Sequence, residues 1–368
     1  MTGRDAALAI WRAGVEAVGG HAATAAALGP QCPRPDLILA VGKAAGAMAR
    51  AALDRFGAVP ALVVTKDGHG ADLSPQARLI EAAHPVPDAR SLAAGRALRE
   101  AVAALGPEAR LLLLVSGGAS SLAEDPVPGK TLGDLAALNR HLLASGLDIG
   151  AMNAERRKLS RIKGGGLLGY FKGAAVQVLA ISDVPGDDLA VIGSGIGAAP
   201  PQPRFAFEAG IVASNATARA AAARAARGMG LTVLADEEAL HEDLDALAAR
   251  LGPRLRSMER GVMILGGEPT VVLPPEPGQG GRNQALGLAL AREIAGLPGL
   301  TVVVGGTDGS DGPTDAAGAV VDGATWGPDA AEALARADSG PYLAEHGALL
   351  RTGPTGTNVM DLLIALRD

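Results

Sequence analysis

The chain of 368 residues is too long for one ordinary hydrophobic core, so two domains are expected. Aromatic residues make up only 2% of it and the net charge is −6, which argues against a protein that stacks bases or neutralises a phosphate backbone. The single cysteine, Cys32, excludes an internal disulfide framework and a cysteine-based metal site.

The amino-terminal segment lacks the basic region and the continuous apolar stretch of a signal peptide. Its apolar residues Leu8, Trp11 and Val15 follow the spacing of an amphipathic helix instead. No run in the sequence approaches the roughly 18 apolar residues of a membrane-spanning helix. We therefore expect a cytoplasmic protein that binds neither nucleic acid nor a membrane.

Residues 37–41 predict a short buried strand, followed by Gly42, Lys43 and the start of a helix rich in small residues. The N–H groups and the dipole at a helix N-terminus favour an anion, and a lysine there can neutralise phosphate as a point charge. A surface lysine on a helix explains the same pattern equally well. Lys43 is therefore a candidate anion-binding residue with a structural alternative.

A second strand and a turn are expected at residues 61–70, and then a loop at residues 81–88 that ends in a helix N-cap. His84 lies in this loop, before a proline that favours extended backbone. It is a candidate substrate contact, and an ordinary loop histidine is the alternative. A helix over residues 89–105 follows and stops at a Gly-Pro pair.

The strand that begins at residue 111 opens into a loop that contains Ser116, Gly117, Gly118 and Ser120. Glycines let the backbone approach a ligand closely, and successive N–H groups in such a loop can bind an anion. The Gly-Lys-Thr sequence further along is not a P-loop, because the position where that motif requires glycine holds Glu124.

Residues 152–166 are rich in arginine and lysine and lead into a run of glycines. In an acidic protein this local positive charge, which includes Lys163, indicates an anionic ligand, with a solvated helix face as the alternative. The strand expected from residue 176 ends at Asp183. Residues 193–198, GSGIGA, match the dinucleotide fingerprint by letter but lack the strand before it and the helix after it, so we infer no dinucleotide site.

The passage into the second domain is expected in a charged helical stretch at residues 236–260, after a helix at 216–229 and a short strand at 231–234. Residues 261–273 predict two strands around Glu268.

Arg282 follows near the start of another helix, where its guanidinium could bind phosphate or carboxylate through two N–H groups. The apolar run from residue 302 predicts a buried strand that ends in a loop with Asp308 and Asp311. These carboxylates could bind Mg²⁺, which prefers oxygen ligands, or could serve only to form turns. A polar turn and a final helix are expected at the end of the chain.

Strands that end in glycine-rich loops recur along the chain and alternate with helical segments, which favours an α/β fold with parallel sheets. The expected domains are residues 1–235 and 236–368, with the active site in the cleft between them. Acidic side chains, basic side chains and glycine loops together suit phosphoryl transfer, because that reaction depends mostly on positioning and charge stabilisation.

Eight sequence blocks resemble, in order, those of the glycerate 2-kinase family, the class II glycerate kinases with a C-terminal MOFRL domain. The blocks are SGGASSL, AAHPVPD, RRKLSRIKGGG, ISDVPGDD, GGEPTVVL, GGRNQALGLAL, GTDGSDGPTDAAGAVVDG and TGPTGTNVMDLL. The resemblance implies a larger Rossmann-like N-terminal domain and a smaller α/β C-terminal domain. It also implies that ATP, with Mg²⁺, phosphorylates D-glycerate at the 2-hydroxyl. D-glycerate and ATP are thus the expected partners, and a homodimer is a further expectation.

By position, Lys43 and Arg282 match the family's important basic residues, and we expect them to neutralise the transferred phosphoryl group and the glycerate carboxylate, in either order. Asp183 is the third expected catalytic residue. The expected substrate or phosphate ligands are Ser116, Gly117, Gly118, Ser120, His84, Lys163 and Thr314. The expected metal ligands are Glu268, Asp308 and Asp311, and an acidic residue of this set or Asp183 would receive the substrate hydroxyl proton.

Two other functions stay open on the sequence. An NAD(P)H-dependent hydroxypyruvate reductase, a label often given to members of this family, would need a dinucleotide fingerprint in the correct context. A non-catalytic sensor of sugar acids or nucleotides would keep the basic residues but could dispense with the acidic ones. Because the acidic residues are present, the kinase interpretation is favoured.

Overall fold

The computed structural model describes residues 2–70, 73, 77–144 and 149–368. The chain forms two compact units, each built on a six-stranded sheet. The parallel-sheet unit consists of Gly19–Ser214 with Gly356–Asn358. The mixed-sheet unit consists of Met1–Val18, Asn215–Thr355 and Val359–Asp368. Both units therefore contain segments that are far apart in the sequence.

All strands of the parallel-sheet unit run in the same direction, in the order β3-β2-β1-β4-β5-β6. They are β1 (Leu37–Val41), β2 (Ala61–Lys66), β3 (Ala77–Ala82), β4 (Arg110–Val115), β5 (Ala175–Ile181) and β6 (Ala206–Ala213). Strands β1 and β4 are almost continuously apolar, because both of their faces are buried. This strand order is the one found in Rossmann-like sheets, and it confirms the α/β architecture expected for this part of the chain.

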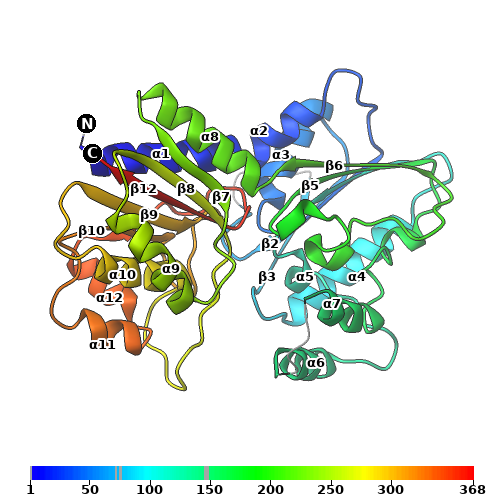
Figure 1. Cartoon of the computed structure of the whole chain (residues 1–368). Helices are drawn as coiled ribbons and strands as arrows, with labels where there is room; N and C mark the ends of the chain where they lie inside the picture. The colour runs from blue at the N-terminus through cyan, green and yellow to red at the C-terminus, as the bar shows by residue number, and fades with distance from the viewer. Residues whose placement is uncertain (1, 71–72, 74–76, 145–148) are drawn as a thin grey trace. The chain divides into compact units, whose positions relative to one another are not determined.

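Helices cover both faces of the parallel sheet, with α2 and α3 on one face and α4 and α5 on the other (Figure 1). The helices are α2 (Gly20–Ala27), α3 (Ala45–Phe56), α4 (Ala89–Ala103), α5 (Ala119–Leu122), α6 (Leu132–Ala144) and α7 (Ile149–Lys158), with short 3-10 turns η1 (Leu168–Tyr170), η2 (Pro185–Asp187) and η3 (Ile192–Gly195). Asp88 caps α4 by accepting hydrogen bonds from the N–H groups of Arg90 and Ser91, which confirms the helix start expected there.

The sheet of the mixed-sheet unit has the order β11-β10-β9-β12-β8-β7. Strands β7 and β8 run parallel, whereas the other neighbouring pairs are antiparallel, so the expectation of parallel sheets is wrong for this unit. The strands are β7 (Val233–Glu238), β8 (Gly261–Gly267), β9 (Leu300–Gly306), β10 (Gly318–Asp322), β11 (Leu349–Leu350) and β12 (Asp361–Arg367).

Two local expectations for this unit are also wrong. The chain ends in strand β12 and not in a helix, since an apolar run buried on both faces has no period that distinguishes the two structures. The second strand expected after Glu268 does not form. Thr270 in this stretch makes only an isolated bridge with Asp243.

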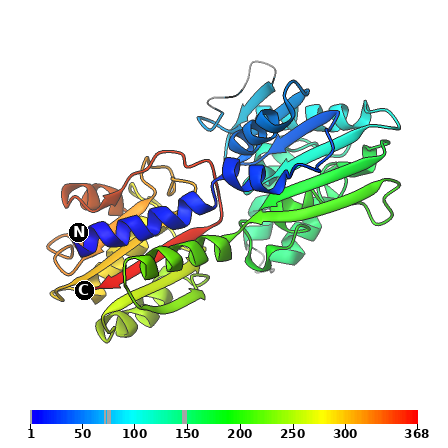
Figure 2. The ribbon, with the colours of Figure 1, turned by 90° about the horizontal axis from the view of Figure 1, so that it is seen from above.

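Helices α1 (Gly3–Ala17) and α8 (Asn215–Gly228) lie side by side on one face of the mixed sheet (Figures 1 and 2). The other face is covered by α9 (Leu244–Arg256), α10 (Arg282–Glu293) and α12 (Ser339–Glu345), with α11 (Ala330–Ala335) beside α10 and α12. Among the described helices, none has both the length and the apolar character needed to cross a membrane.

The division into units differs from the single boundary after residue 235 that the sequence suggested. Helix α1 packs against β12, where the buried indole of Trp11 donates a hydrogen bond of 3.0 Å to the carbonyl of Leu362. Because this contact joins the two ends of the chain, the first helix belongs to the same unit as the C-terminal strand.

Candidate functional site

The order of the parallel sheet reverses between β1 and β4, and ligands of such sheets bind beyond the carboxyl ends of the strands at this point. The loops predicted to bind anions follow these two strands. The N–H of Lys43 donates to the carbonyl of Gly117 at 2.9 Å, and the N–H of Ala44 donates to Oγ of Ser116 at 3.0 Å. Ser116 is fully buried, so its hydroxyl joins the two loops and holds the start of α3 in place.

His84 lies beside these loops. A Cβ atom placed on Gly118 would be 3.2 Å from the His84 ring and 3.2 Å from Cγ of Lys43. Gly118 also has a φ of +81°, which disfavours other residues. The glycine therefore allows a histidine and a lysine from two other loops to approach the same point of the backbone.

Asp183 lies against the neighbouring glycine. A Cβ atom on Gly117 would be 2.0 Å from Oδ2 of Asp183 and 2.0 Å from Nδ2 of Asn358, so only glycine fits here. Asn358 donates to Oδ2 of Asp183 at 3.2 Å. Asn358 was not among the predicted residues, although a polar residue shortly before an apolar strand is a recognisable signal.

A pocket of about 200 Å³ lies next to these residues in the parallel-sheet unit. Three of the predicted ligand residues, His84, Ser120 and Lys163, line it together. Its other lining residues are Pro85, Pro87, Ser121, Glu124, Leu135, Leu138 and Arg156. The pocket thus combines two cationic side chains with one carboxylate, hydroxyl groups and an imidazole, and this excess of positive charge suits a small, polar, anionic ligand.

Lys163 is held in this pocket by a buried carboxylate. Its ammonium is 2.5 Å from Oε2 of Glu124, and the hydroxyl of Ser160 donates to the other oxygen, Oε1. Both charged residues are buried. Glu124 was considered in the sequence only as a residue that excludes a P-loop, and its partner could not be identified there because the two are far apart in the chain. Nearby, burial lowers the pKa of Arg156.

The mixed-sheet unit places Arg282 at the start of α10, as expected, between two carboxylates. Its Nε and Nη2 atoms donate to Oδ2 and Oδ1 of Asp361 at 2.8 and 3.2 Å. Its Nη1 atom donates to Oε1 of Glu268 at 2.6 Å. Burial alone would lower the pKa of Arg282, but the two carboxylates overcome this effect and raise the pKa above its usual range. Asp361 was not among the predicted residues.

Asp311 caps the same helix. Its carboxylate accepts hydrogen bonds from the N–H groups of Asn283 at 3.0 Å and Gln284 at 2.8 Å. A Cβ atom on Gly281 would be 2.2 Å from this carboxylate, so glycine is required for the approach. Burial raises the pKa of Asp311 to about 6, although the hydrogen bonds from the two N–H groups lower it. Thr314 completes this structure by donating to the carbonyl of Asp311 at 2.8 Å.

The predicted metal ligands do not form a ready metal site. Within the residues that the structure describes, no group of three or more His, Cys, Asp or Glu side chains could hold a metal ion. The carboxylate of Asp311 is engaged with α10, and that of Glu268 with Arg282. Asp308 is buried, and its Oδ1 accepts from the N–H of Ser310 at 2.9 Å. Asp308 and Asp361 both face Gly306. A Cβ atom placed on Gly306 would be 3.2 Å from Oδ1 of Asp308 and 3.4 Å from Oδ1 of Asp361.

The segment that matched the dinucleotide fingerprint does not adopt the corresponding structure. Residues Ile192–Gly195 form a 3-10 turn in which Gly193 and Ser194 have left-handed backbone conformations. The turn neither follows a strand directly nor leads into a helix. The hydroxyl of Ser194 lies 2.9 Å from that of Ser120, so the segment contacts α5, the short helix after β4.

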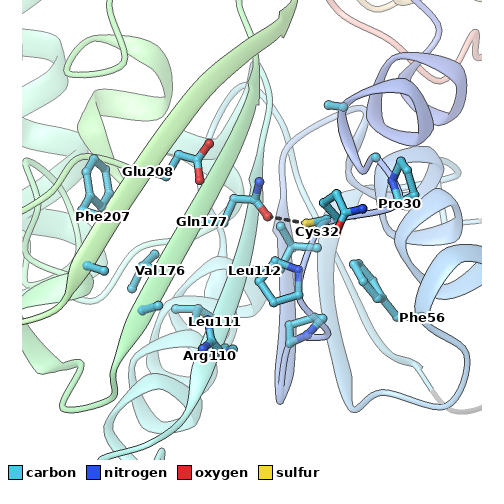
Figure 3. Close-up of a pocket in the computed structure, with 17 residues that line it drawn as sticks. Pro30, Cys32, Phe56, Arg110, Leu111, Leu112, Val176, Gln177, Phe207 and Glu208 are labelled. Atoms are coloured by element: carbon cyan, nitrogen blue, oxygen red, sulfur yellow. Dashed lines mark hydrogen bonds between the residues drawn. The ribbon is translucent and has the colours of Figure 1, made fainter.

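A larger cavity of about 760 Å³ lies at the opposite end of the parallel sheet (Figure 3). Arg110, Ala175 and Ala206 in its wall are the first residues of β4, β5 and β6. Here the thiol of Cys32 donates to Oε1 of Gln177 at 3.0 Å, and burial raises the pKa of the thiol. Because ligands of such sheets bind at the carboxyl ends of the strands, we do not include this cavity in the candidate site.

The chain is similar to known proteins over most of its length. Residues 6–226 match a family described as a domain of unknown function, DUF4147, and residues 261–361 match the MOFRL family. The chain is 37% identical over 378 residues to the D-glycerate 2-kinase of Thermotoga maritima, with 90% of each covered. It is also 37% identical to an Agrobacterium vitis protein named "Putative hydroxypyruvate reductase", with 89% of this chain and 97% of that protein covered. A solved glycerate kinase structure from Thermotoga maritima has a TM-score of 0.86 at 33% identity, and the match covers 99% of both chains.

Proposed function

The chain belongs to the glycerate 2-kinase family, and we propose that it transfers the terminal phosphoryl group of ATP to the 2-hydroxyl of D-glycerate. The products are 2-phosphoglycerate and ADP. Phosphoryl transfer of this kind depends on positioning the reactants and on stabilising the charge that spreads over the phosphoryl oxygens. The cationic side chains, helix N-termini and glycine loops described above are groups of the required kind.

The observation that carries the proposal is the small pocket in the parallel-sheet unit. Its volume of about 200 Å³ suits a three-carbon acid, because pockets for drug-sized ligands occupy roughly 300–1,000 Å³. Lys163 and Arg156 are the two cations in its wall. We assign the carboxylate of glycerate to them, and the glycerate hydroxyl groups to Ser120 and His84.

With the carboxylate assigned to this pocket, Lys43 and Arg282 are left for phosphoryl oxygens. Lys43 directly precedes Ala44, the N-cap of α3, and the N-terminal N–H groups and dipole of this helix favour an anion. Arg282 immediately follows the N-cap of α10 and presents a planar guanidinium suited to phosphate. We therefore propose that both residues stabilise negative charge on ATP during transfer.

We propose that Asp183 receives the proton of the substrate 2-hydroxyl. Its carboxylate lies against Gly117, in the loop that leads into α5, and α5 contributes Ser120 to the pocket. Asn358 holds one of its oxygens by a hydrogen bond. A fixed carboxylate next to the substrate hydroxyl is the arrangement that general base catalysis requires.

Mg²⁺ is proposed to arrive with ATP. This ion usually keeps several waters and uses one or two protein carboxylates together with substrate phosphates, so a protein cage of three acids is not required. Of the predicted ligands, we assign this role to Asp308, a buried carboxylate in the turn that follows β9. When bound, the ion would neutralise charge on the phosphates.

The direct test supplies ATP, Mg²⁺ and D-glycerate to the purified protein and couples the product to enolase without phosphoglycerate mutase. Immediate formation of phosphoenolpyruvate is expected, since enolase accepts 2-phosphoglycerate and not the 3-isomer. Formation of ADP without phosphoenolpyruvate would show a kinase with another position or substrate. Oxidation of NAD(P)H by hydroxypyruvate, without glycerate-dependent formation of ADP from ATP, would show the reductase instead.

The assigned residues are tested by Lys43→Ala and Arg282→Ala. Each variant is expected to lose about 100-fold or more in kcat/KM, because loss of one charge-stabilising donor in a transition state has an effect of about this size. Circular dichroism and thermal unfolding serve as controls for folding. Near-normal turnover in a folded variant would remove that residue from the mechanism.

A further inference from the structure

Arg282 uses the two edges of its guanidinium differently. The edge formed by Nε and Nη2 faces both oxygens of Asp361, a two-bond arrangement that fixes the plane of the group. Nη1 belongs to the outer edge, which it shares with Nη2, and it donates to Glu268. These bonds involve three of the five N–H groups that a guanidinium carries. An anion that binds the outer edge would therefore meet Glu268 and not Asp361.

The two carboxylates also differ in burial. The side chain of Asp361 is 1% exposed, whereas that of Glu268 is 48% exposed. Separating Arg282 from Asp361 would leave a charge in the protein interior without its partner, which is strongly unfavourable. Separating Arg282 from Glu268 only returns a half-exposed carboxylate to water, and such pairs contribute little.

We infer that Glu268 occupies the phosphate-binding edge of Arg282 in the absence of substrate and is displaced by a phosphoryl group of the nucleotide, while Asp361 stays bound and orients the guanidinium. This inference rests on the proposed function, because it takes the anion to be a nucleotide phosphate. It gives Glu268 a role opposite to that of a metal ligand, since a metal ligand assists nucleotide binding and a displaced carboxylate competes with it.

The charge balance supports displacement. Arg282 carries one positive charge and faces two carboxylates, so the cluster has a net charge of −1 before any ligand arrives. A phosphate that approached while Glu268 stayed in place would meet this excess negative charge. When Glu268 moves into water, the remaining pair of Arg282 and Asp361 is neutral and keeps N–H groups on the outer edge for the ligand.

The test compares Glu268→Gln with Glu237→Gln, a matched control in the same unit. Glu237 pairs with Arg254 through two hydrogen bonds of 2.9 and 3.1 Å, and the exposures of the two side chains are 45% and 35%. The pair of Glu268 and Arg282 has exposures of 48% and 34%. Both substitutions remove one negative charge from a half-exposed pair, so a general effect of net charge appears in both.

The dissociation constants of MgADP and of inorganic pyrophosphate are measured by calorimetry for the wild type and both variants. Glu268→Gln is expected to bind both ligands about two- to fivefold more tightly, the range set by the small free energy of a half-exposed pair. Glu237→Gln is expected to keep the wild-type values. Binding by Glu268→Gln that is equal to or weaker than that of the wild type would overturn the inference.

The kinase assay separates this result from the proposed function. If the wild type phosphorylates glycerate but Glu268→Gln binds MgADP and pyrophosphate no more tightly, only the displacement of Glu268 is refuted. A wild-type protein that does not phosphorylate glycerate refutes the proposed function. In that case the pyrophosphate titration still decides whether Glu268 competes for Arg282, since it requires no catalysis.

Discussion

The two units hold the cations of the proposed site in different ways. In the parallel-sheet unit the ammonium of Lys163 and the carboxylate of Glu124 are both buried, with side-chain exposures of 7% and 3%. In the mixed-sheet unit Arg282 has one buried partner, Asp361, and one partner in contact with water, Glu268. In the proposed function each of these cations meets an anion, but only Arg282 has a partner whose separation costs little free energy.

From this difference we expect the role of an ion pair to depend on the burial of both partners and not only on the distance between them. The pair of Lys163 and Glu124 and the pair of Arg282 and Glu268 have nearly equal lengths, 2.5 and 2.6 Å. A pair with both partners buried acts as a fixed support, because breaking it leaves a charge without solvent. A pair with one exposed partner can exchange that partner for a ligand.

The largest expected effect on stability is that of Glu124→Gln. Removing the carboxylate leaves the buried ammonium of Lys163 without its ion-pair partner, so the free energy of unfolding should fall by about 3–5 kcal/mol. Urea denaturation of wild type and variant measures this change. The double variant Glu124→Gln with Lys163→Met should recover much of the loss, because it removes the buried charge as well. A loss below about 1 kcal/mol in the single variant would contradict the comparison.

An intermediate effect is expected from Asp311, a buried carboxylate held by backbone N–H groups of α10. Its pKa is raised to about 6 from the ordinary value of 3.8, so between these pH values the native state binds more protons than the unfolded state. Ionisation of Asp311 should therefore lower the free energy of unfolding as the pH rises from about 4 to about 6, by at most about 3 kcal/mol.

The variant Asp311→Asn isolates this contribution, because asparagine does not titrate. The stability of the wild type minus that of the variant should decrease as the pH rises through this window and should then level off above it. Denaturation curves for both proteins at pH 4, 5, 6 and 7 provide the measurement. A difference that stays constant over the series would show that the pKa of Asp311 is not raised.

The smallest expected effect is that of Glu268→Gln on stability. Its ion pair with Arg282 is half exposed, so the free energy of unfolding should change by no more than about 1 kcal/mol, as for Glu237→Gln. Thermal unfolding of the two variants in the absence of nucleotide measures this. If Glu268→Gln destabilised the protein as much as Glu124→Gln, Glu268 would be a fixed support and the contrast between the units would disappear.

Local sequence patterns were sufficient to predict much of the candidate site. The apolar strands β1 and β4 and the glycine-containing loops after them were expected from residues that are adjacent in the chain, and so was the place of Lys43 before α3. His84, Ser120 and Lys163 were selected separately and line one pocket. Patterns of this kind succeed because strand burial, turn formation and helix starts depend mainly on neighbouring residues.

Other features became visible only in the folded chain, because they join residues that are distant in the sequence. Glu124 and Lys163 are 39 positions apart, and Arg282 and Asp361 are 79 apart. The sequence shows that each residue is charged, but not which charges are buried together. The same reason explains why α1 packs against β12. It also explains the strand at residues 361–367, because a short apolar segment can form a helix or a strand, and its distant neighbours decide between them.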